Sequence, residues 1–171
     1  MFVSEYAGEA CMAKKMEKTN VMRLLDQKKV PYESYCYIDA ATTVGTEVAA
    51  VLGQDPNQVF KTLVTVGGKT KQNFVFVIPV NKELDLKKAA NAVGEKSIEM
   101  IKSKELLPLT GYIHGGCSPI GMKKFFTTTI HETAKDWDTI IFSGGKIGCQ
   151  VEVSLADLAK VITFGVQDIC D

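Results

Sequence analysis

A glycine-rich run is the densest group of residues in this sequence that could carry chemistry. It reads GGCSPIG from Gly115 to Gly121, with His114 before it and Lys123 after it. Glycine lets a backbone approach a ligand closely, and consecutive N–H groups can bind a carboxylate, a phosphate or a developing oxyanion. The run therefore predicts an anion-binding loop, although a tight structural turn would explain the spacing equally well.

Two further glycine-rich turns are present, SGGKIG from Ser143 to Gly148 and the pair Gly67-Gly68. The pair lies between two β-rich runs and predicts a hairpin turn. Neither GxxxxGK[ST] nor GxGxxG occurs in the chain, so nucleotide hydrolysis and dinucleotide binding lack their usual sequence support.

Lys61 is unusual because it interrupts the apolar run VFKTLVTV. In a strand it would share a face with Val59 and Leu63, turned toward the interior or a cleft. A desolvated lysine needs a partner or a bound anion. The alternative is a lysine on a strand edge whose ammonium group reaches water.

Cys117 could be a nucleophile, with His114 or His131 as its base. The five cysteines are odd in number, form no CxxC pair and show no zinc-site spacing, and there are two histidines. We therefore expect reduced thiols, no metal site and no cofactor. A Ser-His-Asp triad lacks the GxSxG turn that would hold its serine.

The elements that must position these residues indicate an α+β fold, because the predicted strands cluster as hairpins instead of alternating with long helices. We expect one domain, with a mixed, mostly antiparallel, curved sheet and flanking helices. Residues 1–15 are expected to be a disordered lead and 16–171 the domain. Among the predicted elements are a helix capped by Asp85 with Leu86 facing inward, and a strand over Val161–Phe164.

Composition narrows the class of protein. With 46% hydrophobic and 23% charged residues and no apolar run of the ~18 residues that a membrane helix needs, we expect a soluble globular protein without a membrane span. The reduced thiols predict that it is cytoplasmic. The net charge is zero, yet residues 61–124 hold eleven lysines against five acidic residues. That segment could form a face for a polyanion, or be ordinary solvated surface.

Several motifs together resemble the YbaK/EbsC family of free-standing Cys-tRNA(Pro) deacylases, which are related to the editing domain of prolyl-tRNA synthetases. They keep the family's order over residues 18–170 and read VMRLLDQKKVPYESYCY, FKTLV, LDLKKAANAVG, TGYIHGGCSPIGMKK and IIFSGGKIG…VEVSLADLAKV. The combination of FKTL, GGxSPxG and SGGK is specific, whereas each motif alone is weak.

The resemblance implies roles for particular residues. Lys61 matches the family's essential lysine, which is expected to hold the substrate's 3′-terminal region or its carbonyl, and Gly115 lies in the loop beside the aminoacyl ester. Residues that would bind substrate in this family correspond to Tyr37, Gly116, Ser118, Ser143 and Gly144. The position of Cys117 is ordinarily a small residue such as valine, isoleucine or threonine, which weakens the nucleophile hypothesis.

The resemblance also implies a mechanism and partners. In this family the substrate's cysteine thiol is thought to attack its own ester carbonyl, so that no protein nucleophile is needed. The expected partners are the acceptor end of mischarged tRNA(Pro) and prolyl-tRNA synthetase, with no membrane.

Three other functions stay open at this point. The chain could edit tRNA carrying alanine or serine, act as a non-catalytic adaptor for tRNA or a synthetase, or be a thiol hydrolase that uses Cys117. The sequence leaves open the oligomeric state, the need for a synthetase and the roles of Cys149 and Gln150.

Overall fold

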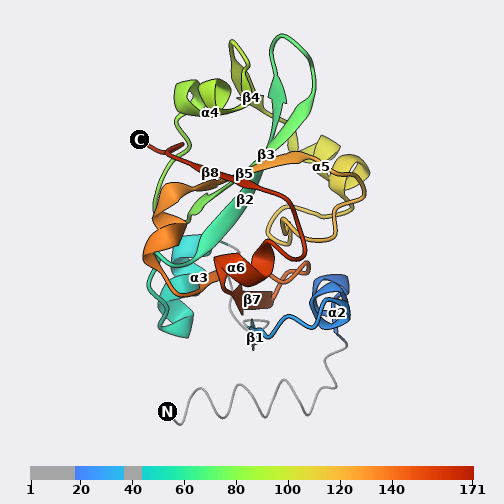
Figure 1. The fold of residues 1–171 in the computed structure, drawn as a ribbon, viewed down its shortest axis with the longest axis vertical. Coiled ribbons are helices and arrows are strands. Elements are labelled where there is room, and N and C mark those ends of the chain that lie inside the picture. Colours follow the sequence, from blue (N-terminus) through green and yellow to red (C-terminus); the bar gives the residue numbers. More distant parts are fainter. Residues whose placement is uncertain (1–17, 37–43) are drawn as a thin grey trace.

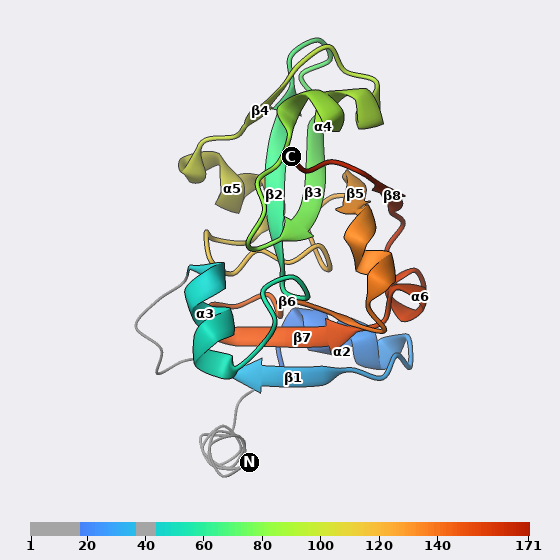
Figure 2. The same ribbon diagram turned by 90° about the vertical axis from the view of Figure 1, so that its left-hand side faces the viewer.

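Two hydrogen-bonded sheets make up the strand content of residues 18–36 and 44–171, the parts of the chain that this computed structural model describes (Figures 1 and 2). The smaller sheet has the order β1–β7–β6 and is antiparallel. The larger has the order β4–β2–β3–β5–β8, antiparallel from β4 to β3 and parallel from β3 to β8. The strands are β1 (Glu33–Cys36), β2 (Phe60–Gly67), β3 (Asn73–Pro79), β4 (Ile98–Met100), β5 (Thr127–His131), β6 (Ile140–Ser143), β7 (Cys149–Val153) and β8 (Gly165–Gln167).

Short helices flank the two sheets. Their beginnings follow local capping: the Thr19 hydroxyl accepts from the Met22 N–H, and the Asp85 carboxylate accepts from two backbone N–H groups. Within the described ranges, no helix is long and apolar enough to cross a membrane. The helices are α2 (Asn20–Gln27), α3 (Gly45–Leu52), α4 (Leu86–Val93), α5 (Ser103–Thr110), α6 (Leu155–Leu158) and the 3₁₀ helix η1 (Glu132–Asp136).

The predicted α+β class, with a mixed sheet and flanking helices, is confirmed, although the strands divide between two sheets. The strand predicted over Val161–Phe164 is wrong, because the N–H groups of Val161 and Ile162 close the turn after α6 on the Leu158 carbonyl. Strand β8 begins just after that segment. Leu86 is 44% exposed instead of facing inward. The lead predicted for residues 1–15 lies outside the described residues.

The larger sheet separates two apolar clusters. On one side, Val64 and Val75 pack with α2 and with the smaller sheet, which lies across the lower end of the β2–β3 hairpin in Figure 2. On the other side, Phe76 packs with α4 and with the C-terminal residues Ile169 and Cys170. The β2–β3 hairpin is therefore the wall shared by both halves of the core.

Glu95, which follows α4, holds the tip of that hairpin. The carboxylate of Glu95 is buried and accepts hydrogen bonds from the N–H groups of Lys69 and Thr70, at 3.3 Å each, and from the Thr70 hydroxyl. A Cβ on Gly67 would lie 2.3 Å from the Glu95 carboxylate, so any side chain at this position would have to displace that carboxylate. The Gly67-Gly68 hairpin turn predicted from the sequence is confirmed.

These hydrogen bonds, led by the one from Thr70, hold the pKa of Glu95 below its ordinary value of 4.5. The unfolded chain therefore binds the proton more readily, and the stabilisation by Glu95 is present above pH 4.5 and lost as the pH falls through the folded-state pKa. We expect Glu95→Gln to lower the free energy of unfolding at neutral pH, with a difference from wild type that shrinks on acidification. Urea unfolding across the acidic range measures this, with the exposed Glu99→Gln as control. A difference independent of pH would contradict the prediction.

Candidate active site

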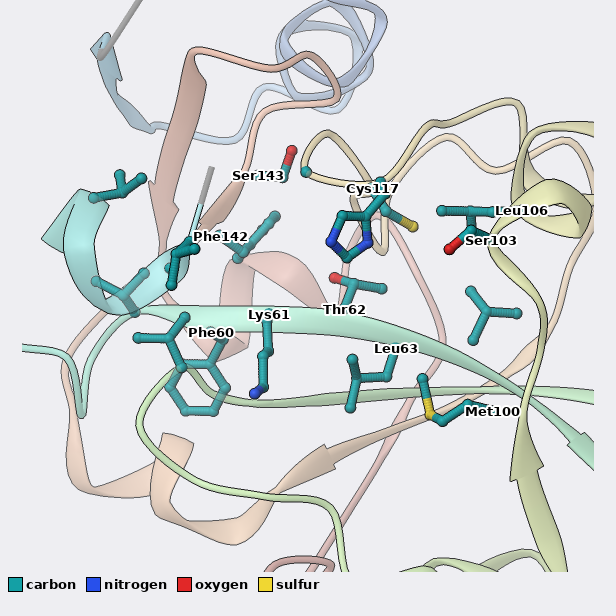
Figure 3. A pocket seen from close by; sticks show the side chains of 18 of the residues that line it. Phe60, Lys61, Thr62, Leu63, Met100, Ser103, Leu106, Cys117, Phe142 and Ser143 are labelled. Atoms are coloured by element: carbon teal, nitrogen blue, oxygen red, sulfur yellow. The ribbon is translucent and has the colours of Figure 1, made fainter. Parts of the chain in front are cut away.

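A cleft of about 430 Å³ opens beside the first half of β2. Its volume falls in the range typical of small-molecule sites, roughly 300–1,000 Å³. Residues from both sheets, from α3 and α5 and from the glycine-rich loops line it (Figure 3). They are Val44, Gly45, Val48, Val59–Val64, Val80, Met100–Ser103, Leu106, His114, Gly115, Cys117, Phe142, Ser143 and Gln150.

The cleft exists because β2 is paired unequally on its two sides. Strand β3 pairs with β2 over its whole length, whereas β4 pairs only with Thr65–Gly67. Beyond that pairing, the Ile101 N–H reaches the Val64 carbonyl at 3.3 Å, and the chain then turns into α5. The edge of β2 from Phe60 to Leu63 is left facing the cleft.

Lys61 lies on this edge, with its side chain partly buried. Figure 3 shows Lys61 and Leu63 leaving β2 on one side and Thr62 on the other, the side on which Cys117 and Ser143 lie. Burial raises the pKa of Cys170 to about 11, and the charges of Lys82 and Lys61 oppose that rise. The Lys61 side chain therefore lies on the face of the larger sheet that the C-terminal segment covers, and it reaches the cleft from that face.

Two glycine-rich loops meet at the far wall of the cleft. A Cβ on Gly116 would lie 3.1 Å from the backbone nitrogen of Ile147, so the first loop packs directly against the second. Gly115 adopts a left-handed backbone, with φ of 88°, at the point where the first loop enters the cleft. The left-handed backbone at Gly115 and the close packing at Gly116 explain the Gly115-Gly116 pair better than a simple turn does.

The structure brings together three of the seven predicted site residues, since Lys61, Gly115 and Ser143 all line the cleft. The other described ones are buried behind its surface. The N–H groups of Gly116 and Gly144 donate to the carbonyls of Ile113 and Cys149, and the Ser118 hydroxyl accepts from the Ile120 N–H. Tyr37 lies outside the described residues.

Tyr112 packs against both glycine-rich loops. Its hydroxyl donates to the Ile120 carbonyl at 2.5 Å, and a Cβ on Gly121 would lie 2.8 Å from that hydroxyl. A Cβ on Gly145 would lie 2.8 Å from the Val21 side chain of α2 and 3.3 Å from the Tyr112 ring. Helix α2 and Tyr112 thus hold both glycine-rich loops in place.

Cys117 faces the cleft but is unsuited to nucleophilic attack. The residue is 9% exposed, and burial raises the pKa of its thiol to about 12. A nucleophilic cysteine requires the thiolate, which such a pKa disfavours. His131, one of its two predicted bases, is buried elsewhere and accepts the Ile169 N–H on its Nδ1 at 3.2 Å.

Thr62 was not predicted from the sequence and Gln150 was given no role, yet both line the cleft. The Gln150 carbonyl oxygen accepts from the Gln54 amide at 2.8 Å, a contact across 96 residues that no local motif could reveal. Thr62 could have been found, because strand alternation places the neighbour of Lys61 on the opposite face.

The electrostatic character of the cleft is cationic to neutral. Its described lining includes Lys61 and Lys102 but neither aspartate nor glutamate. Among the residues that the structure describes, no group of His, Cys, Asp and Glu could hold a metal ion. This lining suits a substrate that carries phosphate or a developing oxyanion.

Comparisons with known proteins agree with this chemistry. Residues 39–161 match the family model described as "Aminoacyl-tRNA editing domain". The chain is 51% identical over 146 residues to a protein of Enterococcus faecalis named "Putative Cys-tRNA(Pro)/Cys-tRNA(Cys) deacylase EbsC", covering 84% of this chain and 88% of the relative.

Two more distant relatives are a synthetase and a solved structure. The chain is 30% identical over 124 residues to the proline–tRNA ligase of Shouchella clausii, covering 70% of this chain and 20% of that enzyme. The crystal structure titled "Crystal structure of a putative trans-editing enzyme for prolyl tRNA synthetase" superposes with a TM-score of 0.75 at 22% identity, covering 91% of this chain and 99% of the other. It shares the fold.

Replacing Gly145 with alanine tests the packing of the cleft wall. Gly145 and Gly53 both have left-handed backbones, with φ of 92° and 68°, but a Cβ on Gly53 would meet nothing within 4 Å. Gly53→Ala should therefore cost only the backbone penalty, about 1–2 kcal/mol in the free energy of unfolding. Gly145→Ala should cost about 1–3 kcal/mol more, because its Cβ collides with Val21. Urea unfolding compares the two variants, and equal losses would contradict the packing argument.

Alkylation tests the state of Cys117. With a pKa of about 12, the thiol should react with iodoacetamide at pH 8 at least ~100-fold more slowly than free cysteine, whose pKa is about 8.5. Peptide mass mapping of the folded protein over time resolves Cys117 from the other cysteines, and the urea-unfolded protein is the control. Reaction at the rate of free cysteine would restore the nucleophile hypothesis.

Proposed function

The chain belongs to the aminoacyl-tRNA editing domain family, and from that premise we propose that it deacylates mischarged Cys-tRNA(Pro). The observation that carries the proposal is the cleft, in which Lys61, Gly115 and Ser143 converge from three segments that together span more than 80 residues of the chain. The name of the Enterococcus faecalis relative supports cysteine as the amino acid that is removed.

The chemistry of the cleft supports cleavage that relies on the substrate's own thiol. In this mechanism the cysteine sulfur forms a bond to its ester carbonyl carbon, and the bond from that carbon to the tRNA ribose oxygen breaks. The proton lost by the thiol ends on the ribose oxygen, and cysteine leaves as a cyclic thiolactone. A thiol tethered so close to an activated ester needs orientation more than it needs a protein base.

Gly115 and Lys61 have separate tasks in this proposal. The loop at Gly115 presents backbone N–H groups to the carbonyl oxygen as negative charge develops on it. Lys61 orients the ester by holding the 3′-terminal nucleotide, a task that suits an ammonium group at the strand edge, on the side away from Ser143. The pKa of about 12 at Cys117 keeps the protein's own thiol out of the reaction.

The proposed partners are the acceptor end of tRNA(Pro) and prolyl-tRNA synthetase. Residues 61–124 carry a net charge of +6 within a chain of zero net charge, which favours local contacts with RNA over strong binding by the whole surface. Selection of tRNA(Pro) would then come from the synthetase. A cytoplasmic location is part of the same proposal, because aminoacyl-tRNA is made and used there.

Deacylation of purified Cys-tRNA(Pro), Ala-tRNA(Pro), Ser-tRNA(Pro) and Cys-tRNA(Cys) tests this function directly. We expect both cysteinyl substrates to be cleared fastest, because alanine has no nucleophile and the serine hydroxyl is a poor one. Lys61→Ala should lower kcat/KM by about 100-fold or more, the scale for losing a charged group that orients or stabilises the reacting centre. Lys82→Ala removes a lysine on the same side of the sheet but outside the cleft, and Cys117→Ala removes the buried thiol; both should keep activity.

The outcomes separate the competing functions. Clearance of Ala-tRNA(Pro) or Ser-tRNA(Pro) instead would assign another amino acid, and loss of activity in Cys117→Ala would indicate a thiol hydrolase. If no substrate is cleared even with prolyl-tRNA synthetase present, the enzyme hypothesis fails and an adaptor that binds tRNA or synthetase replaces it.

A further inference from the structure

The hydroxyl of Thr62 is an anomaly in the cleft. Its oxygen is buried and makes no hydrogen bond, whereas Thr65, three residues along the same strand, donates to the Phe74 carbonyl at 2.9 Å. A buried hydroxyl without a partner costs free energy that an apolar side chain of the same shape would avoid. A position that carries this cost is a candidate for binding something that is absent from the free protein.

The Thr62 side chain lies on the same face of β2 as residues of the two glycine-rich loops. Its side chain lies on the face of β2 opposite Lys61, the face above which Cys117 and Ser143 lie (Figure 3). Thr62 lines the cleft and is partly exposed although its oxygen is covered, so contact between the hydroxyl and a ligand requires a change of the χ1 rotamer. Threonine is restricted at χ1, so the hydrogen bond to the ligand must outweigh the cost of the change in rotamer.

Two other polar side chains of the cleft lining, those of Ser143 and Gln150, each already accept a hydrogen bond from the protein. The Ser143 hydroxyl accepts from the Gly145 N–H at 3.1 Å, and the Gln150 carbonyl oxygen accepts from the Gln54 amide at 2.8 Å. The described lining contains no carboxylate that could receive a cationic group. An aminoacyl ester nevertheless brings an α-amino group into the cleft, and this group needs an acceptor.

We propose that the Thr62 hydroxyl accepts a hydrogen bond from the α-amino group of the aminoacyl ester. The inference rests on the proposed function and adds to it the residue that orients the aminoacyl moiety. Lys61 then holds the nucleotide from one face of β2 while Thr62 holds the amino acid from the other. With both ends fixed, the rotation that remains is the one that brings the thiol to the carbonyl.

Removing the hydroxyl should separate stability from activity. Thr62→Val keeps the shape and the β-branch, so its free energy of unfolding should equal or exceed that of wild type. Its kcat/KM on Cys-tRNA(Pro) should fall about 10-fold or more, the loss expected for a hydrogen bond to a charged group. Thr62→Ser keeps the hydroxyl and should retain most of the activity. Thr133→Val removes another buried, unpartnered hydroxyl, one outside this cleft, and should leave activity unchanged.

A substrate without the amino group identifies the partner of the hydroxyl. We expect Thr62→Val and wild type to clear 3-mercaptopropionyl-tRNA(Pro), which keeps the thiol and lacks the α-amino group, at rates within about twofold of each other. An equal loss on both substrates would overturn the assignment to the amino group. Unchanged clearance of Cys-tRNA(Pro) by Thr62→Val, or a less stable Thr62→Val, would overturn the role of the hydroxyl.

The two proposals fail differently in this experiment. If wild type clears Cys-tRNA(Pro) and Thr62→Val matches it, only the assignment of Thr62 falls. If wild type clears neither substrate, the proposed function fails, and the assignment of Thr62 fails with it.

Discussion

The unequal pairing of β2 is the constraint on which the cleft depends. Hydrogen bonds to β3 run along the whole strand, but β4 stops after Thr65–Gly67, and at the other end the bridge from Val59 to Ile141 joins β2 to the smaller sheet. The strand is therefore held firmly at both ends and along one side. Between those ends, the other edge of β2 faces the cleft. A site built on a strand held in this way is more precise than a site built on loops alone.

The wall opposite β2 is made of backbone packed against backbone. Where Gly116 approaches Ile147, even a Cβ on the glycine would force one of the two loops to shift. Tyr112 and Val21 occupy the space beside Gly145, so the loops are supported from below as well as by each other. Ordering this wall therefore depends on packing with α2, an element that lies more than 80 residues earlier in the chain.

Local signals in the sequence predicted most of the elements, because caps and turns act over a few residues. Asp85 and the Gly67-Gly68 pair each mark the boundary that the structure shows. Predictions failed where distant contacts decide: Val161 closes a helical turn despite its β-branched side chain. Lys61 was identified from its odd place in an apolar run, but the face it occupies depends on how α4 and the C-terminal segment cover the sheet.

For the candidate site, the sequence named residues that shape the cleft as well as residues that line it. Ser118 and Gly144 belong to the same motifs as Gly115 and Ser143, and a motif does not distinguish the member that faces a ligand from the member that holds the loop. Thr62 carried no motif signal beyond its position after Lys61. The missing hydrogen bond of its hydroxyl became visible only in the structure, since a buried hydroxyl without a partner can be recognised only when all its neighbours are in place.

The proposed division of labour between substrate and protein would explain why the cleft contains so few reactive groups. If the substrate supplies its own nucleophile, a reactive protein thiol or an additional base would bring unwanted chemistry to every correctly charged tRNA that enters. In the proposed mechanism, Lys61 and the Thr62 hydroxyl bind and orient the substrate, and the buried Cys117, with its pKa of about 12, does not attack it. Selectivity then follows from reactivity: an aminoacyl group held in the same pose but lacking a thiol has nothing with which to cleave its own ester.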